Sequence, residues 1–257
     1  MTIAQSCDGC RSGEPFPIDF TMAFQPIIDS ASNSIWGYEA LVRGRNGEGA
    51  GTVLAAVNDE NRYRFDQACR VKAIELAGAR MPAGSRAKLS INFMPNAVYE
   101  PAACIRASLA AAARSNFDPK RLMFEFTENE RMGDTEHVKT IVDSYKKMGF
   151  TTALDDFGAG YAGLGLLAKF RPDVLKIDME LIRGIVASPA RQAIVKAIVG
   201  IGRDLEITVL AEGVEEASEL AILQRAGVHL FQGYLFARPQ LETFVAAAQI
   251  PRFGAPA

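Results

Sequence analysis

The sequence predicts an α/β protein, a modified TIM (β/α)8-type barrel whose first strand runs antiparallel to the rest. From residue 22 onward, short β-branched or aromatic runs alternate with alanine-rich amphipathic stretches. Eight of these runs are typical of strands, which is the number that closes a barrel of this kind. Only the residues DSASNS separate the first two runs, and so short a link cannot hold a crossover helix. The first two strands are therefore expected to be antiparallel.

The expected elements follow one another along the chain in this alternation. The strand candidates are MAFQPII (22–28), IWGYEALV (35–42), KLSINF (88–93), LMFEFT (122–127), FTTALD (150–155), DVLKID (173–178), ITVLAE (207–212) and LFQGYLF (230–236). Helical patterns, with apolar residues three and four positions apart, cover 64–79, 100–115, 134–149, 190–205 and 216–228. We expect the strands to form the inner wall and the helices to cover it from outside.

Composition and charge bound the organisation of the protein. Of 257 residues, 49% are hydrophobic and 23% are charged, which is typical of a folded chain and sufficient for one barrel. We expect one domain over residues 21–250, with a flexible leader over 1–20 and a loose tail over 251–257. The net charge of −2 and the lack of a basic run argue against a nucleic-acid polymer as partner. No apolar stretch reaches membrane-spanning length and the N-terminus is polar, so we expect a cytoplasmic protein without a membrane segment.

The four cysteines do not have the spacing of a secreted disulfide scaffold. Cys7 and Cys10 form a C-x-x-C pair, which could be half of a zinc site or a redox couple. A structural zinc needs four ligands, and the sequence has no second Cys/His pair of suitable spacing. A frayed leader at the chain terminus is the preferred interpretation.

Polar residues gather at the carboxyl ends of the expected strands, where a barrel of this class places its active site. They are Glu39, Asn92, Glu125, Asp155 with Asp156, Lys176, Asp178 and Glu212, with Gln232 on the last strand. One such carboxylate alone is most often a solvated strand end. Carboxylates that converge from four strands repel one another unless cations hold them. Because all ligands would be oxygens, the set favours a hard divalent ion such as Mg²⁺, Mn²⁺ or Ca²⁺.

Asp155 and Asp156 are adjacent carboxylates just before a glycine-rich turn. In a two-ion site, one of them could bridge both ions while the other binds only the second. Two ions about 3.5–4 Å apart stabilise the attacking and the leaving oxygen in phosphoryl transfer. The pattern therefore predicts hydrolysis of a phosphoester.

Two further charged residues have alternative interpretations. Lys176 either points into the barrel, where it could activate a water, or extends over the surface. In a strand, Lys176 and Asp178 share one face and the apolar Leu175 and Ile177 share the other, which favours the inward position for Lys176. Glu128 is either an acid at a helix N-terminus or a contact to the nearby glycine-rich loop, and its position alone leaves both open.

An ordered series of motifs runs between Phe24 and Pro239: FQPI, EALVR, SIN, FEFTE, DDFGAGY, LKID, AEGVE and QGYLFARP. This series resembles the EAL domain family of bacterial cyclic di-GMP phosphodiesterases. The resemblance implies a barrel whose first strand is antiparallel. It also implies opening of cyclic di-GMP to linear pGpG with Mg²⁺ or Mn²⁺, two ions per site.

The resemblance also implies a role for each matching residue. Glu39, Asn92, Glu125 and Asp155 would bind the first ion, and Asp155 with Asp156 the second, with Glu212 acting there directly or through water. Lys176 would position the nucleophilic water, which makes Lys176, Glu212 and Glu39 the expected catalytic set. The substrate site would be lined by Gln25, Leu41, Arg43, Asp178, Gln232 and Pro239, and Glu128 would anchor the loop FGAGYAGL. We expect Ca²⁺ to occupy the site but to inhibit, because its looser coordination places the water poorly.

Several positions depart from the family pattern. Ala162 and Gly163 stand where two serines are more common, Phe93-Met94-Pro95 follows Asn92, and residues 44–67 resemble EAL domains that serve light-sensing proteins as output modules. These changes bear on regulation and on the expected homodimer, which would form through the region after Asp156. Every metal position is filled, which favours an active enzyme over a catalytically silent cyclic di-GMP receptor. Metal-dependent carbon-acid chemistry on a small acid is a more remote alternative.

Overall fold

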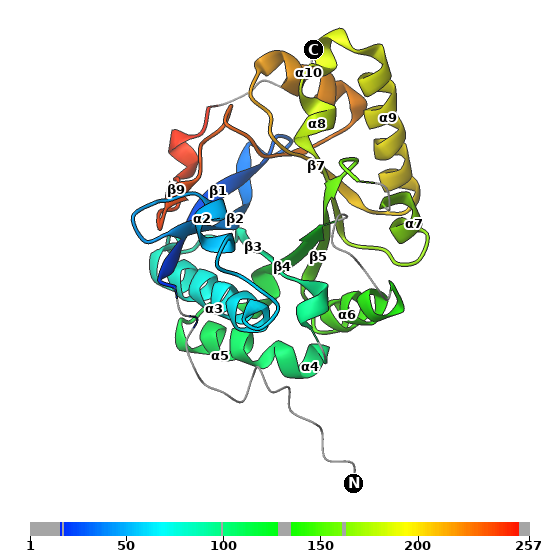
Figure 1. Ribbon diagram of the computed structural model, residues 1–257. Helices are drawn as coiled ribbons and strands as arrows, with labels where there is room; N and C mark the ends of the chain where they lie inside the picture. The colour runs from blue at the N-terminus through cyan, green and yellow to red at the C-terminus, as the bar shows by residue number, and fades with distance from the viewer. Residues whose placement is uncertain (1–15, 17, 99, 128–134, 161–162, 252–257) are drawn as a thin grey trace.

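A closed barrel of strands forms the centre of the molecule (Figure 1). The computed structural model describes residues 16, 18–98, 100–127, 135–160 and 163–251. In this part of the chain the wall is built from β1 (Phe20–Asp29), β2 (Ser34–Gly44), β3 (Lys88–Asn92), β4 (Leu122–Thr127), β5 (Thr151–Phe157), β6 (Val174–Ile177), β7 (Thr208–Ala211) and β8 (Leu230–Phe231). Neighbouring strands are parallel from β2 to β8.

The antiparallel strand is β1. It pairs with β2 along its whole length and with β8 at Ile28 and Asp29, and these two pairings close the barrel. The link between β1 and β2 is a tight turn in which the Asp29 carboxylate accepts the Ala31 N–H at 2.9 Å and Asn33 adopts a φ of +50°. The predicted antiparallel first strand is confirmed.

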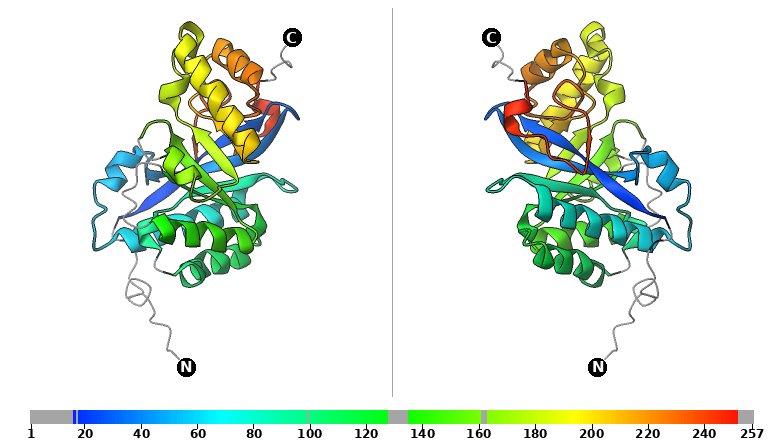
Figure 2. Two further views of the ribbon diagram at one scale, coloured as in Figure 1. Left: turned by 90° about the vertical axis from the view of Figure 1, so that its right-hand side faces the viewer. Right: turned by 90° about the vertical axis from the view of Figure 1, so that its left-hand side faces the viewer.

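Helices surround the barrel on two opposite sides (Figures 1 and 2). Towards one side lie α3 (Arg62–Arg80), α4 (Pro101–Cys104), α5 (Arg106–Arg114) and α6 (Thr135–Lys147), and towards the other lie α8 (Met179–Ile182), α9 (Pro189–Asp204) and α10 (Ala217–Ala226). The short helices α2 (Ala50–Leu54) and α7 (Gly163–Leu167) follow β2 and β5. No helix in the described ranges is both long enough and apolar enough to cross a lipid bilayer.

Some expected elements differ in extent from the observed ones. The helix expected over 100–115 is divided into α4 and α5 at Ile105. The last strand, expected over 230–236, ends at Phe231. The Gln232 N–H still donates to Ala211 of β7, but the Gln232 carbonyl and the Leu235 N–H bond to the backbone of Val214. A two-residue strand, β9 (Gln240–Leu241), pairs with Ala23 and Phe24 of β1 and was not predicted.

The apolar floor of the barrel lies one layer below its polar mouth. Ile27, Met123, Ala153, Val174, Leu210 and Leu230 form one buried cluster. Five of them lie two residues before a polar residue of the mouth, which is in the same strand for Met123, Ala153 and Val174 and directly after the strand for Leu210 and Leu230. The period-two alternation of a strand therefore points both residues of each pair inward. The floor residues therefore seal the barrel beneath Glu125, Asp155, Lys176, Glu212 and Gln232.

The ends of the predicted domain stay a prediction. β1 begins at Phe20, and Phe16 is buried with its ring centroid 5.1 Å from that of Phe65 on α3. Cys7 and Cys10 lie outside the described residues.

Candidate metal centre at the barrel mouth

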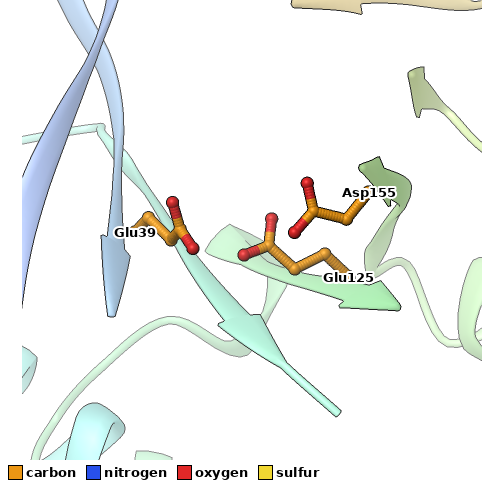
Figure 3. Close-up of side chains that lie close together, drawn as sticks. All are labelled: Glu39, Glu125 and Asp155. Carbon is orange, nitrogen blue, oxygen red and sulfur yellow. The ribbon is translucent and has the colours of Figure 1, made fainter. Parts of the chain in front are cut away.

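Three carboxylates converge at the centre of the barrel mouth. Figure 3 shows Glu39 of β2, Glu125 of β4 and Asp155 of β5 with their carboxylates turned toward one another. All three side chains are buried. One ligand oxygen from each lies within 4.8 Å of the others. Asp155, Asp156 and Glu212 form a second such group, so Asp155 belongs to both.

Lys176 supplies the positive charge at the centre of this cluster. Its side chain is fully buried and points inward, and Nζ lies 2.7 Å from Glu212, 3.0 Å from both Glu125 and Asp155, and 3.7 Å from Glu39. One lysine cannot balance four carboxylates in a low-dielectric site. The remaining negative charge is what a divalent cation or added protons would neutralise.

An irregularity in β5 brings both adjacent aspartates to the same site. The register between β5 and β6 shifts between Leu154 and Phe157, which leaves Asp155 and Asp156 opposite Lys176 alone. Asp156 adopts a φ of +55°, in the left-handed region where Asp and Asn are tolerated better than most side chains. In a regular strand the two side chains would face opposite sides. The bulge therefore explains how both carboxylates reach the mouth.

Amide and hydroxyl side chains hold the carboxylates in place. Asn92 Nδ2 donates to Glu39 at 3.3 Å and to Glu125 at 3.1 Å, and Ser90 Oγ donates to Glu125 at 2.6 Å. Gln232 Nε2 donates to Glu39 at 2.6 Å and to Gln25 at 3.1 Å. Because Nδ2 faces the two carboxylates, the Asn92 amide would have to turn about its χ2 bond to present Oδ1 to a hard cation held between them.

Burial raises the pKa of several of these acids. Burial, which outweighs the opposing effect of Lys176, raises the pKa of Glu125 well above its usual range, and burial together with Asp155 does the same for Glu212. Burial and the neighbouring Asp155 raise the pKa of Asp156 to about 6. For Lys176, burial lowers the pKa, but the attraction of four carboxylates exceeds it and the pKa is raised. Carboxyl pKa values raised in a cleft are typical of functional sites.

Two cavities flank the acidic cluster and receive most of the predicted substrate residues. A cavity of about 230 Å³ is lined by Gln25, Asp178 and Gln232 together with the acids. A second, largely apolar cavity of about 330 Å³ is lined by Leu41, Arg43 and Asn92. Pro239 is half-buried and lines neither of them, and Glu128 lies outside the described residues. Asp178 also caps α8 by accepting the Glu180 N–H at 2.7 Å.

The cavity beside Asp178 is lined by further residues that have no role predicted from the sequence, although Glu215 lies in the motif AEGVE and Tyr234 in QGYLFARP. Arg183 and Glu215 form an ion pair at 2.9 Å on its wall, and Tyr234 lines it with 46% of its surface exposed. Arg238 stacks on the ring of Tyr234 at 4.1 Å. None of these four belongs to a strand, so strand alternation could not find them. Ser90 was findable, because it lies two residues before Asn92 on β3 and shares its face.

The fold and this site define a class of protein: a barrel of the (β/α)8 type with one antiparallel strand and a candidate divalent-metal centre at the carboxyl ends of its strands. The particular family follows from comparison with known proteins. The profile of the EAL domain family matches residues 18–239, and the chain belongs to that family.

Related proteins of known structure or name are found in several bacteria. A standalone EAL protein of Vibrio cholerae O395, solved in its c-di-GMP bound form, is 54% identical with a TM-score of 0.85; the match covers 90% of this chain and 96% of that one. BlrP1 of Klebsiella pneumoniae, in a manganese and cyclic di-GMP complex, is 37% identical with a TM-score of 0.81, covering 91% and 58%. The blue light- and temperature-regulated antirepressor BluF of Escherichia coli is 34% identical over 219 residues, or 85% of this chain and 54% of BluF.

This chain thus spans about half the length of BluF. Further matching proteins bear the name cyclic di-GMP phosphodiesterase.

Proposed function

We propose that this chain is a phosphodiesterase that hydrolyses cyclic di-GMP to linear 5′-pGpG and so lowers a bacterial second messenger in the cytoplasm. The observation that carries the proposal is Asp155, which belongs to two groups of carboxylates and lies 3.0 Å from Lys176. Support comes from the relatives in Vibrio cholerae and Klebsiella pneumoniae, whose structures contain cyclic di-GMP.

The donor set fits two hard cations, Mg²⁺ or Mn²⁺. Glu39, Asn92, Glu125 and Asp155 would hold the first, and Asp155, Asp156 and Glu212 the second. Carboxylate and amide oxygens are the ligands that these ions prefer. Two such ions, when bound, make a water more acidic and stabilise both the attacking and the leaving oxygen of an in-line displacement. The manganese in BlrP1 supports this choice of metal.

Side chains of the protein would orient the attacking water, stabilise charge on the phosphate and exclude bulk solvent. Lys176, held among Glu125, Asp155 and Glu212, would orient the attacking water and stabilise charge on the phosphate. Addition of water across one P–O3′ bond leaves a 3′ hydroxyl and a 5′ phosphate, which is the product pGpG. The apolar floor excludes bulk water from below, which strengthens these electrostatic interactions.

The two cavities would receive the two halves of the dinucleotide. Gln25 and Gln232 border the first cavity, where the exposed ring of Tyr234 offers a face for stacking a base. Leu41 and Arg43 border the second, where the Arg43 guanidinium already donates to the Val42 carbonyl at 2.7 Å. Pro239 in substrate binding and Glu128 as the loop anchor stay proposals, and Glu128 lies outside the described residues.

Turnover is the direct test. Purified protein with cyclic di-GMP and Mn²⁺ or Mg²⁺ should yield pGpG on chromatography, and omission of metal should abolish it. Glu39→Ala should abolish it as well. The control Glu75→Ala, which removes the exposed ion pair between Glu75 of α3 and Arg114 of α5, should leave turnover unchanged. If cyclic di-GMP stays intact in every reaction with the wild-type protein, the proposed phosphodiesterase activity is refuted.

Calcium should inhibit the reaction. Ca²⁺ takes more oxygen ligands at longer distances than Mg²⁺ or Mn²⁺, so it should bind the same carboxylates but hold the water in a less suitable position. We expect initial rates in Mn²⁺ to fall as Ca²⁺ is added. An undiminished rate in Ca²⁺ alone would contradict the proposed two-ion site.

A catalytically silent receptor for cyclic di-GMP is the second candidate, and the similarity to the antirepressor BluF favours it. The two functions differ in one measurement. A receptor binds cyclic di-GMP tightly in equilibrium dialysis with Mn²⁺ and releases no product, whereas the enzyme releases pGpG.

We also propose a homodimer that forms through the region after Asp156. Helix α7 begins seven residues after Asp156, and its Leu164 side chain is 63% exposed. This exposed leucine offers apolar surface that a second copy would bury. Leu164→Asp should shift sedimentation toward the monomer and change turnover per chain; unchanged sedimentation would contradict this interface.

A further inference from the structure

A buried ion pair on α3 lies next to the metal centre without belonging to it. Asp66 and Arg70 are four residues apart, their charged atoms are 2.6 Å apart, and each side chain is only 2% exposed. Burying two charges costs about as much as their attraction returns, and apolar residues of similar size often stabilise a fold at least as well. The pair therefore needs an explanation other than stability.

The second oxygen of Asp66 connects α3 to the end of β3. Asp66 Oδ1 accepts the backbone N–H of Met94 at 2.9 Å. One residue earlier, the Phe93 N–H donates to the carbonyl of Glu125 at 2.9 Å. The two amides that follow Asn92 are thus held from two sides, by β4 and by α3. Pro95 comes next and has no N–H, so Met94 is the last consecutive donor through which this segment can be held.

We propose that Asp66, held by Arg70, is a positioning residue for the Asn92 side chain, an inference that rests on the proposed metal centre. Asn92 Nδ2 contacts both Glu39 and Glu125, so the amide lies beside the site. Turning it about χ2 brings Oδ1 to a cation at that place only if the backbone at the exit of β3 is fixed. A carboxylate acceptor makes a stronger bond to an amide than a neutral acceptor does. Outer groups that orient a ligand in this way typically change metal affinity or activity by about 10–100-fold.

The test uses two double variants that both remove the buried charges. In Asp66→Asn with Arg70→Met, the asparagine oxygen can still accept the Met94 N–H. In Asp66→Leu with Arg70→Met, a side chain of similar size offers no acceptor. Mn²⁺ affinity is measured by titration calorimetry, and kcat with saturating cyclic di-GMP, at a temperature where circular dichroism shows both proteins folded.

We expect the asparagine variant to stay close to the wild type, and the leucine variant to bind Mn²⁺ about tenfold or more weakly, with kcat reduced to match. Equal Mn²⁺ affinities in the two folded variants would overturn the proposal. If the leucine variant does not fold, Asp66→Ala with Arg70→Met removes the acceptor without bulk. Failure of both to fold beside a folded asparagine variant would also overturn it, since the bond would then serve the fold and not the ligand.

The calorimetric comparison needs no turnover. A wild-type protein that binds Mn²⁺ but leaves cyclic di-GMP intact would refute the phosphodiesterase and leave the difference between the variants as the test of Asp66.

Discussion

Asp156 illustrates how one backbone dihedral angle can bring a second carboxylate to a site. Its φ of +55° and the shift in register beside it turn a second consecutive carboxylate into the barrel mouth. Asp155 Oδ1 also accepts the Asp156 N–H at 3.0 Å, which fixes the two residues relative to each other. The left-handed conformation restricts which replacements are informative, because alanine would add backbone strain to the loss of the carboxylate.

Asp156→Asn separates charge from conformation. Asparagine tolerates the left-handed region as aspartate does, so we expect the melting temperature to change little. Loss of one carboxylate from the group Asp155, Asp156 and Glu212 should lower kcat by about 100-fold or more. This exceeds the usual effect of removing a residue that contacts a metal ligand but not the metal. A steady-state assay with Mn²⁺ measures this, and a kcat within about threefold of the wild type would mean that Asp156 binds no ion.

Lys176 is the residue whose removal should affect stability most at this site. Lys176→Met would leave Glu125 and its neighbours without their buried counter-charge, which we expect to cost roughly 3–5 kcal/mol in the metal-free protein at pH 7.5. The loss should be smaller at pH 5.5, because protonation of carboxylates with raised pKa removes the unpaired charge. Urea unfolding at both pH values tests this.

The exposed Lys196 on α9 provides the control for that experiment. Lys196→Met should change stability by less than about 0.5 kcal/mol at either pH. Equal losses of unfolding free energy in the two lysine variants would show that the buried Lys176 charge stabilises the fold no more than an exposed lysine does.

At the scale of elements, close contact between two loops shapes the mouth. Gly233 follows Gln232 at the exit of β8, and a Cβ there would lie 2.0 Å from the Val214 carbonyl oxygen and 2.4 Å from its nitrogen. The same Val214 donates to Gln232 and accepts from Leu235. Gly233 is therefore required by the close approach of two backbones, and this approach positions Gln232 against Glu39.

Gly233→Ala and Gly200→Ala should act in opposite directions. At Gly233 the methyl group would push the β7 and β8 exit loops apart, and we expect lower stability and lower turnover. At Gly200 in α9 nothing lies within 4 Å of an added Cβ, so alanine should stabilise by about 0.4–1 kcal/mol. Thermal unfolding and turnover of the two variants test this, and a neutral Gly233→Ala would refute the contact.

The elements also show how far the sequence could predict the site. Strand alternation was sufficient to place Glu125, Asp155, Lys176 and Glu212 on the inner face, because these strands are regular up to that point. It could not predict the bulge at Asp156, whose cause is a local φ angle, nor the Asp66 contact to Met94, which joins residues 28 positions apart. Arg183, Glu215 and Tyr234 lie on loops whose course depends on tertiary packing. The motifs AEGVE and QGYLFARP include Glu215 and Tyr234, but only the structure places all three around one cavity.

At the scale of the whole molecule, the charge of the mouth links stability to metal and pH. The pKa of Asp156 is about 6 in the fold and ordinarily 3.8, so its protonated form is favoured by folding. That contribution to stability is complete below about pH 4 and is lost as pH rises through about 6. A divalent ion needs the deprotonated carboxylates, so it should bind more tightly as pH rises through the same range.

We therefore expect Mn²⁺ to raise the melting temperature more at pH 7.5 than at pH 5.5. Differential scanning calorimetry with and without Mn²⁺ measures this difference, and Asp156→Asn should reduce it. A rise that is the same at both pH values would mean that the metal does not displace protons from these acids.

The central proposal is that this mouth holds two divalent ions that share Asp155. The most direct test is an anomalous difference map from crystals grown with Mn²⁺ and cyclic di-GMP. We expect two peaks, one among Glu39, Asn92, Glu125 and Asp155, and the other beside Asp155, Asp156 and Glu212. A single peak, or peaks away from Asp155, would contradict it.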